Sequence, residues 1–325
     1  MEFTICSADL MEVCPLPDSI ALDFDIGQEN DVEISCSRGQ VSAGQWIVSF
    51  GTEYAAVLEE VTSNTNDSAE TWCGNAPRKF LQQFIIQPPD GQAYLTVSGD
   101  AHAVMRQVLN GAFGGLFSIP EEASGIQINS YSFDRYTDAL TGFTKMLIKK
   151  NARINIEIVQ VGPNEPFRIV LSAVPIQNLE TEIQYSQDSK VNVQIKKSTR
   201  GINHLICLGK GELTERQVVH LYAQFDGSVG STQYYTGFQE RTSVYENTNA
   251  EDITALTEDG TEKLQELMNF EQMSMSVQDV DLTIGDIISG RNYENGMYIA
   301  QPVIQKVVTI SGGIPEISYK VEGED

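Results

Sequence analysis

The sequence has few cysteines and no long hydrophobic run, and each scarcity excludes a class of protein. Its 325 residues include only five cysteines, an odd number without CxxC or CxH spacing, so neither a disulfide framework nor a zinc site is indicated. No window approaches the roughly 18 uninterrupted apolar residues that a membrane span needs. We therefore expect no membrane span, and free structural thiols at Cys6, Cys14, Cys36, Cys73 and Cys207.

Positive charge is also scarce. Lys plus Arg number 21 against 45 Asp plus Glu, a formal charge of −24, which disfavours direct binding to nucleic acid phosphates. The negative surface either keeps the protein soluble at high concentration or keeps a passing polyanion from sticking. The N-terminal stretch MEFTICSADLMEVC carries acids where a signal peptide carries Lys or Arg and lacks a long apolar segment, so we expect synthesis and retention in a cytoplasm.

What the sequence does contain is period-two alternation, beginning in its first third. Apolar and polar residues alternate over 20–26, 32–36 and 46–50, with Ile47 interrupting the pattern, and Asn64–Ser68 has the composition of a hairpin tip. The segment Pro88-Pro89-Asp90-Gly91 is a strong turn signal, because proline fixes φ and glycine accepts positive φ. Residues 1–97 are predicted to form an N-terminal β-barrel domain.

The period then changes to a helical one. One apolar face comprises Ala101, Val104, Met105, Val108 and Leu109, with Ser98 and Asp100 as N-cap acceptors and Gly111 as a stop. A second comprises Tyr136, Ala139, Leu140, Phe143 and Leu147, closed by Lys149 and Lys150. Strands at 154–158 and 167–171, joined by a turn over 162–166, complete a predicted helix-plus-hairpin domain over residues 98–172.

Residues 173–325 are predicted to form a second β-barrel domain with a helical insertion at about 249–269. Its strand signals are Ile183 with Tyr185, residues 191–195, the two apolar runs of GINHLICLGKGELTERQVVHLYAQFDGSVG (201–230, the second run ending at Phe225), 282–286, 298–310 and 317–321. Turns are expected at 209–212, Asn295-Gly296 and Gly312-Gly313. Asn249 and Asp252 can cap the helix, which Gly260 weakens. The fold class is β-rich α+β: two small β-barrel-like domains around a helix-containing middle domain.

Signals for chemistry are poor. The three histidines, His102, His204 and His220, lie on an apolar helix face and in two apolar strands, where buried or rim histidines are commoner than catalytic ones. The acid pairs Glu59-Glu60 and Glu121-Glu122 could serve a glycosidase, although 45 acids give such pairs by chance. The cations Lys196, Lys197 and Arg200 are most simply a solvated strand edge.

No known catalytic motif is present in the sequence. Gly209-Lys210-Gly211 is not a phosphate loop, since GxxxxGK followed by Ser or Thr is absent, and neither GxSxG nor HExxH occurs. The sequence therefore predicts a protein without enzymatic activity, with no catalytic, cofactor-binding or metal-binding residues assigned and no cofactor.

Several segments taken together resemble a known family. They are Trp72-Cys73-Gly74 before FIIQPP (84–89), YLTVSGDA (94–101), LGKGELTERQVVHLY (208–222), and the C-terminal IGDIISGR (284–291), AQPVIQKVV (300–308) and ISYKVEGE (317–324). In their order and spacing they are similar to the phage tail baseplate-hub proteins, with their siphophage tail-tip relatives and the hubs of contractile phage-tail-like bacteriocins. The resemblance covers most of the chain.

The resemblance implies a structural role in a virion or phage-tail-like particle. It implies a homotrimeric ring that joins the sixfold tail tube to the threefold spike, with two related barrels per chain. The implied partners are the tube or tube-initiator protein, the central spike, other baseplate components and the tape measure protein. The alternatives are a tail-associated cell-wall hydrolase that uses carboxylates and a carbohydrate-binding β-module.

Overall fold

The computed structural model describes residues 1–162, 165–179, 192–198, 200–248, 250, 252–268, 271–276, 282–291 and 298–321. The chain forms two compact units. Unit 1 comprises Met1–Asn192, Met275–Ser289 and Ala300–Lys320, and unit 2 comprises Val193–Ser274, Gly290–Ile299 and Val321–Asp325. The predicted domain boundaries near residues 97 and 172 stay a prediction. The two compact units begin and end at other residues.

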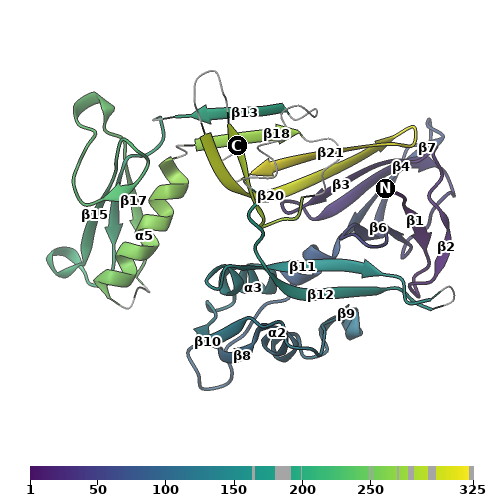
Figure 1. Ribbon diagram of the computed structural model, residues 1–325, viewed down its shortest axis with the longest axis horizontal. Helices are drawn as coiled ribbons and strands as arrows, with labels where there is room; N and C mark the ends of the chain where they lie inside the picture. Colours follow the sequence, from purple (N-terminus) through teal and green to yellow (C-terminus); the bar gives the residue numbers. More distant parts are fainter. Residues whose placement is uncertain are drawn as a thin grey trace. The chain divides into compact units, whose positions relative to one another are not determined.

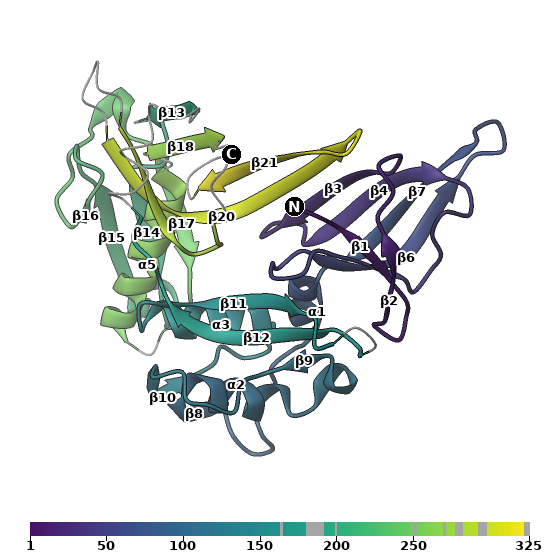
Figure 2. The same cartoon turned by 45° about the vertical axis from the view of Figure 1, so that its right-hand side comes forward.

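A large sheet dominates unit 1 and contains strands from both the N-terminal and the C-terminal parts of the chain. Its strand order is β21-β20-β3-β4-β7-β6-β5-β1-β2. In Figure 2 the long strands β3, β4 and β7 lie side by side, in antiparallel register. The bounds are β1 Thr4–Cys6, β2 Glu12–Pro15, β3 Ala21–Ile26, β4 Asp31–Ser37, β5 Trp46–Val48, β6 Ala55–Ser63, β7 Ala69–Asn75, β20 Tyr298–Ser311 and β21 Ile314–Val321.

This sheet curls around a core of its own. Phe3, next to β1, stacks on Phe24 of β3 with ring centroids 5.6 Å apart, although four strands separate β1 from β3 in the sheet order. Tyr54 packs edge-on against Phe24 at 6.0 Å, and all three rings are buried. Side chains thus bridge the concave face, while the path of the described strands stays open from β21 to β2. The predicted β-rich α+β class is confirmed.

The irregular polarity of β5 has a simple cause. Trp46 and Val48 belong to one hydrophobic core, and Ile47 belongs to the other. Successive side chains of a strand point to opposite faces, so a strand covered on both faces is apolar throughout. The sheet around β5 therefore separates the core inside its curl from the core of the helical part of unit 1.

The helical part of unit 1 contains α1 Pro77–Gln83, β8 Thr96–Asp100, α2 Ala101–Leu109, the 3-10 segment η1 Ala112–Gly115, β9 Phe117–Ser118, β10 Gln127–Ser132, α3 Ala139–Ile148, β11 Ala152–Val159 and β12 Arg168–Pro175. The predicted hairpin is confirmed as β11 and β12, on which α3 and α2 pack. The strand-only expectation for residues 1–97 is wrong at α1. Pro77 starts that helix, because its fixed φ suits a first helical position.

The two predicted amphipathic helices are confirmed with small corrections. The Asp100 side chain caps α2 by accepting from the amide of His102 at 3.0 Å, whereas Ser98 lies in β8 and accepts from Ser130. Asp138 caps α3 by accepting from the amide of Thr141 at 2.8 Å. Tyr136 was expected on the apolar face of this helix but precedes it, with φ 58° and an exposed ring.

The C-terminal segment returns to the N-terminal sheet. Residues 306–310 of β20 pair with residues 22–26 of β3, and β19 (Ile287–Arg291) pairs with β20. The strand expected at 282–286 is instead a turn that precedes β19. Gly285 adopts φ +94° there, which an extended strand does not allow. The turns predicted at Gly91 and at Gly312-Gly313 are present, and all three glycines have positive φ.

In unit 2 the central stretch forms the predicted pair of strands, β14 (His204–Leu208) and β15 (Val218–Ala223), in antiparallel register. β16 (Val229–Gly230) and β17 (Thr242–Glu246) complete the order β16-β15-β14-β17, with short 3-10 segments η3 (Leu213–Glu215) and η4 (Gly237–Gln239). Strands β13 (Asn192–Lys197) and β18 (Glu271–Ser276) pair with each other. Phe225 was expected within the second apolar run but follows β15 and is exposed.

Helix α5 (Ile253–Met268) covers one face of this four-stranded sheet, as Figure 1 shows. Asp252 caps it by accepting from the amides of Thr254 and Ala255, both at 2.9 Å. Gly260 lies where the helix meets β14: a Cβ atom there would come within 2.4 Å of the Cys207 sulfur. The glycine that weakens the helix by itself thus permits its close packing on the sheet.

Some predictions fall outside the described residues: the middle of the 162–166 turn, Ile183 with Tyr185, the start of the 191–195 strand, Asn249 as a cap, the Asn295-Gly296 turn and the last residues of ISYKVEGE. Over the ranges that are described, no helix combines the length and apolar character needed to span a bilayer.

Candidate functional site

A buried carboxylate, Glu53, lies in the loop between β5 and β6. The loop is fixed from both sides: Thr52 donates its hydroxyl proton to the Ser49 carbonyl at 2.7 Å, and the amide of Ile158 on β11 donates to the Thr52 carbonyl at 2.7 Å. The amide of Tyr54 donates back to the Thr52 hydroxyl at 3.1 Å. Because these bonds hold the loop, the Glu53 side chain has a defined direction into unit 1.

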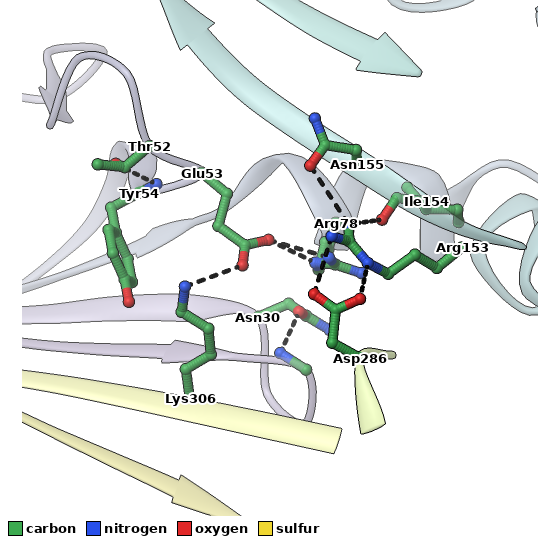
Figure 3. A network of polar contacts seen from close by, with 11 residues as sticks. Asn30, Thr52, Glu53, Tyr54, Arg78, Arg153, Ile154, Asn155, Asp286 and Lys306 are labelled. Carbon is green, nitrogen blue, oxygen red and sulfur yellow. Dashed lines mark hydrogen bonds and ion pairs between the residues drawn. The ribbon is translucent and has the colours of Figure 1, made fainter. Parts of the chain in front are cut away.

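Glu53 meets two cations (Figure 3). Arg78 of α1 donates Nε and Nη2 to Oε2 at 3.0 and 2.9 Å, and the Lys306 ammonium on β20 faces Oε1 at 3.4 Å. Lys306 also lies 4.8 Å from the ring centroid of Tyr54, a cation–π distance. Burial alone would raise the pKa of Glu53, but the charges of Arg78 and Lys306 outweigh it and hold the pKa below its ordinary value.

A second buried ion pair joins the hairpin to the C-terminal segment. Arg153 of β11 donates Nε and Nη2 to the two carboxylate oxygens of Asp286 at 2.7 and 2.9 Å, a bidentate pair (Figure 3). The amide of Gln177 donates to the same carboxylate at 2.8 Å. Asp286 therefore joins the start of β11 and the segment after β12 to the turn before β19.

A hollow of about 110 Å³ adjoins Glu53 and Lys306, and its wall also includes Thr52, Asn155 and Glu157. A proton-transfer site needs a carboxyl group whose pKa lies near the working pH. The pKa of Glu53 is shifted the other way, and its oxygens are engaged by cations. The geometry thus supports a clamp between chain segments rather than acid–base chemistry.

His102, the first of the three histidines, has a structural role. The His102 ring is buried, with Nδ1 2.8 Å from the Glu122 carbonyl and Nε2 accepting from the amide of Ala173 at 3.1 Å. Nδ1 therefore carries the proton and donates it to the carbonyl. The ring connects α2 to β12 and to the loop at Glu122, and both of its nitrogens are used.

The other two histidines come together on neighbouring strands of unit 2. His204 Nε2 lies 2.9 Å from His220 Nδ1, and His204 Nδ1 lies 2.8 Å from the Glu240 carboxylate and 3.1 Å from the Thr242 hydroxyl. The Tyr222 ring stacks on His204 with centroids 4.4 Å apart. The hydrogen bond from His204 lowers the pKa of Glu240 below its ordinary value. The sequence spacing of positions 204, 220 and 240 does not predict this cluster.

The predicted acid pairs do not form a site. Glu59 and Glu60 are exposed in the middle of β6, and Glu121 and Glu122 are exposed in a loop of the helical part. Arg200 is exposed, while Lys196 and Lys197 lie on β13 with side chains outside the description. Their role as a solvated strand edge stays a prediction.

The cysteines are all free thiols. Cys6, Cys36 and Cys207 are buried, Cys73 is half-buried and Cys14 is exposed. Burial, with smaller contributions from Glu12 and Cys14, raises the pKa of Cys6 to about 12, so this thiol stays protonated at neutral pH. Within the described ranges, no group of three or more His, Cys, Asp or Glu side chains is arranged around a common ion position.

Sequence reasoning missed the buried ionic residues Glu53, Arg78, Arg153, Asp286 and Lys306. One signal was available: Glu53 is the only charged residue in WIVSFGTEYAAVL, and Lys306 is the only charged residue in YIAQPVIQKVVTI. A lone charge in a segment that must be buried needs a partner of opposite sign. The sequence could not say which partner.

Comparison with known proteins gives a fold but no sequence family. No protein-family profile matches the chain, and no curated protein matches it by sequence. Among solved structures, the 43 kDa tail protein of prophage MuSo2 from Shewanella oneidensis aligns with a TM-score of 0.60 and 8% identity, covering 99% of this chain and 98% of that one.

Two further structures are similar over nearly their full lengths. The tail protein from Neisseria meningitidis MC58 aligns with a TM-score of 0.56 and 10% identity over 100% of this chain and 96% of that one. Prophage tail protein gp18 from Listeria monocytogenes EGD-e aligns with a TM-score of 0.50 and 12% identity over 98% and 94%. At these identities the likeness shows that the chain shares their fold.

Proposed function

We propose that the chain is a structural protein of a phage tail or phage-tail-like contractile particle, and within it the baseplate hub. The observation that carries this proposal is the mutual coverage with the MuSo2 tail protein, 99% of this chain and 98% of that one. A shared single domain would be compatible with many functions, because one fold hosts many of them. A shared arrangement along the whole chain is a stronger argument for a shared role.

The hub assignment adds an assembly to this role. In it, three chains close a ring between the sixfold tail tube and the threefold spike, with contacts to other baseplate proteins and to the tape measure protein. The sequence resemblance to hub proteins supports it. Closed cyclic symmetry lets identical heterologous contacts satisfy every subunit, so a ring of three needs only one kind of interface.

A role in assembly also agrees with the chemistry of unit 1. Its buried acids, Glu53 and Asp286, are paired with arginines, and the exposed acid pairs at 59–60 and 121–122 lie on separate elements. A glycoside hydrolase instead needs two carboxylates facing each other across a cleft, one of them with a raised pKa. These observations favour assembly over the hydrolase alternative.

Imaging of the intact particle tests the location and the copy number together. We expect cryo-electron microscopy of particles carrying this chain to place three copies at the tip of the tail tube, around the spike. Six copies in one layer, or copies found only in peripheral baseplate arms, would contradict the hub assignment while leaving a structural tail role standing. Absence from the particle would contradict both.

Purified components provide a second test. Light scattering of the full chain, with and without the spike protein of the same particle, should give a trimer mass at least when the spike is present, since mass action couples the two associations. A monomer at all concentrations in both conditions would count against the ring. Incubation with peptidoglycan should give no turnover, whereas turnover abolished by acid-to-amide substitution would establish the hydrolase.

A further inference from the structure

The open face of the unit 2 sheet carries a histidine pair that the proposed function does not use. Helix α5 covers the face that contains Leu205, Cys207 and Leu221. Because side chains alternate along strands, His204 and His220 lie on the other face, at diagonal positions of the β14–β15 register. His204 is buried against its neighbours, and His220 is exposed.

Hydrogen bonds define how the protons are distributed. The Glu240 carboxylate lies 2.8 Å from His204 Nδ1 and can only accept, so Nδ1 carries the His204 proton. In the neutral His204 ring, Nε2 then presents a lone pair, which points at His220 Nδ1 at 2.9 Å. His220 donates Nδ1–H in this arrangement and leaves its own Nε2 available for solvent.

We propose that His204 Nε2 and His220 Nδ1 form a binding site for a borderline divalent transition metal ion of the Zn²⁺ type. The ion takes the place of the shared proton, and that proton moves to the solvent-facing Nε2 of His220. Neutral imidazoles then supply two ligands, and water fills the remaining positions. Imidazole nitrogen suits Zn²⁺, Cu²⁺ and Ni²⁺, whereas Mg²⁺ and Ca²⁺ require oxygen ligands.

The spacing between the two nitrogens requires only a small adjustment. With Zn–N bonds of about 2.0–2.1 Å, a tetrahedral ion separates two nitrogens by about 3.3 Å, a few tenths of an ångström more than their present spacing. The exposed His220 ring can make this movement. The His204 ring stays in place, because Tyr222 stacks on it at 4.4 Å and Glu240 holds its Nδ1.

Glu240 has the position of an outer-shell carboxylate. Metal-binding histidines typically donate their second N–H to a carboxylate or carbonyl, which fixes the tautomer and raises the basicity of the ligand nitrogen. His204 has this bond already, reinforced by the Thr242 hydroxyl 3.1 Å from the same nitrogen. The third histidine offers a contrast within the chain, since both ring nitrogens of His102 are engaged by backbone groups.

The test is a calorimetric titration of Zn²⁺ into the full chain, prepared without a histidine tag, at slightly alkaline pH. We expect one saturable site in the wild type and none in His220→Gln, whose exposed position leaves folding intact, as an unchanged melting temperature without zinc would verify. Glu240→Gln should weaken binding by about 10- to 100-fold. Cys14→Ser, which removes the exposed thiol, should bind like the wild type, and Mg²⁺ should give no isotherm.

Imidazole nitrogen NMR shifts give a second readout. Zinc should move the ring signals of His204 and His220 and leave those of His102 unchanged. Absence of saturable zinc binding in the wild type, or equal binding in His220→Gln, would overturn the proposal. Equal affinity in Glu240→Gln would overturn the role of the carboxylate alone. None of these outcomes bears on the hub assignment.

Discussion

Arg153 and Asp286 are 133 residues apart in sequence, yet they form a bidentate ion pair with nitrogen–oxygen distances of 2.7 and 2.9 Å. Both side chains are almost completely buried. Each of the two side chains therefore needs the other, because an unpaired buried charge has lost its hydration without gaining a partner of opposite charge. The pair ties the hairpin of unit 1 to the segment that enters β19 and β20.

Asp286→Asn should accordingly destabilise the protein by about 3–5 kcal/mol in urea unfolding. The matched control is Asp134→Asn, which removes a pair with Lys145 at 2.9 Å where both side chains are more than half exposed. An exposed pair contributes about 1 kcal/mol or less. Equal losses in the two variants would show that the Arg153–Asp286 pair does not hold unit 1 together.

The stability contributed by Glu53 should depend on pH in a defined direction. Its pKa is lowered from the ordinary 4.5, so the contribution is complete above about pH 4.5 and is lost as the pH falls through the lower folded-state pKa. Glu53→Gln should cost about 3 kcal/mol at neutral pH, with a smaller difference from wild type near pH 3. Urea unfolding curves at several pH values measure the difference in unfolding free energy between the wild type and Glu53→Gln. A difference that grows as the pH falls would contradict the prediction.

Gly91 tests the turn that leads toward β8. It has φ +78°, and a Cβ atom there would meet no neighbour within 4 Å, so a substitution strains only the backbone. Gly91→Val should cost about 1 kcal/mol or more. Gln92→Val, at the next exposed position, is the control and should change thermal stability by about 0.5 kcal/mol or less. No difference between the two variants would argue against the turn.

Gly260→Ala tests the opposite situation, in which a glycine is required because a neighbouring side chain leaves no room for a Cβ atom. Alanine normally favours a helix by about 1 kcal/mol over glycine, but here its Cβ would lie 2.4 Å from the Cys207 sulfur. We expect a net loss of about 1–3 kcal/mol from overpacking. Cys207→Ala in the same chain should recover part of that loss in a double-mutant cycle. A stabilised Gly260→Ala protein would exclude close packing of α5 on β14.

One prediction concerns assembly and rests on the proposed function. The Phe238 side chain is 96% exposed, so its whole apolar ring is available for burial against another subunit. Phe238→Ser should leave the melting temperature unchanged and reduce incorporation into particles. Val13→Ser, at an exposed position of β2, serves as the comparison for a general loss of surface hydrophobicity. Normal incorporation of Phe238→Ser would remove this residue from any subunit contact.

The sequence by itself determined the local elements. Period-two alternation over residues 20–36 became β3 and β4, and the helical face from Ala101 became α2 with Asp100 as its cap, because both patterns follow from side-chain direction in a single element. It also gave the positive φ of Gly91. These features depend on residues a few positions apart.

Only the tertiary structure decided the long-range contacts. That β20 pairs with β3, that Ile47 points into a different core from Trp46, and that Arg153 meets Asp286 all depend on which faces and edges remain to be covered once the elements have formed. The same holds for His204 and His220, which a two-strand register places on one face. A local pattern specifies which face of an element is apolar, but its partner is selected by burial and charge compensation over the whole unit.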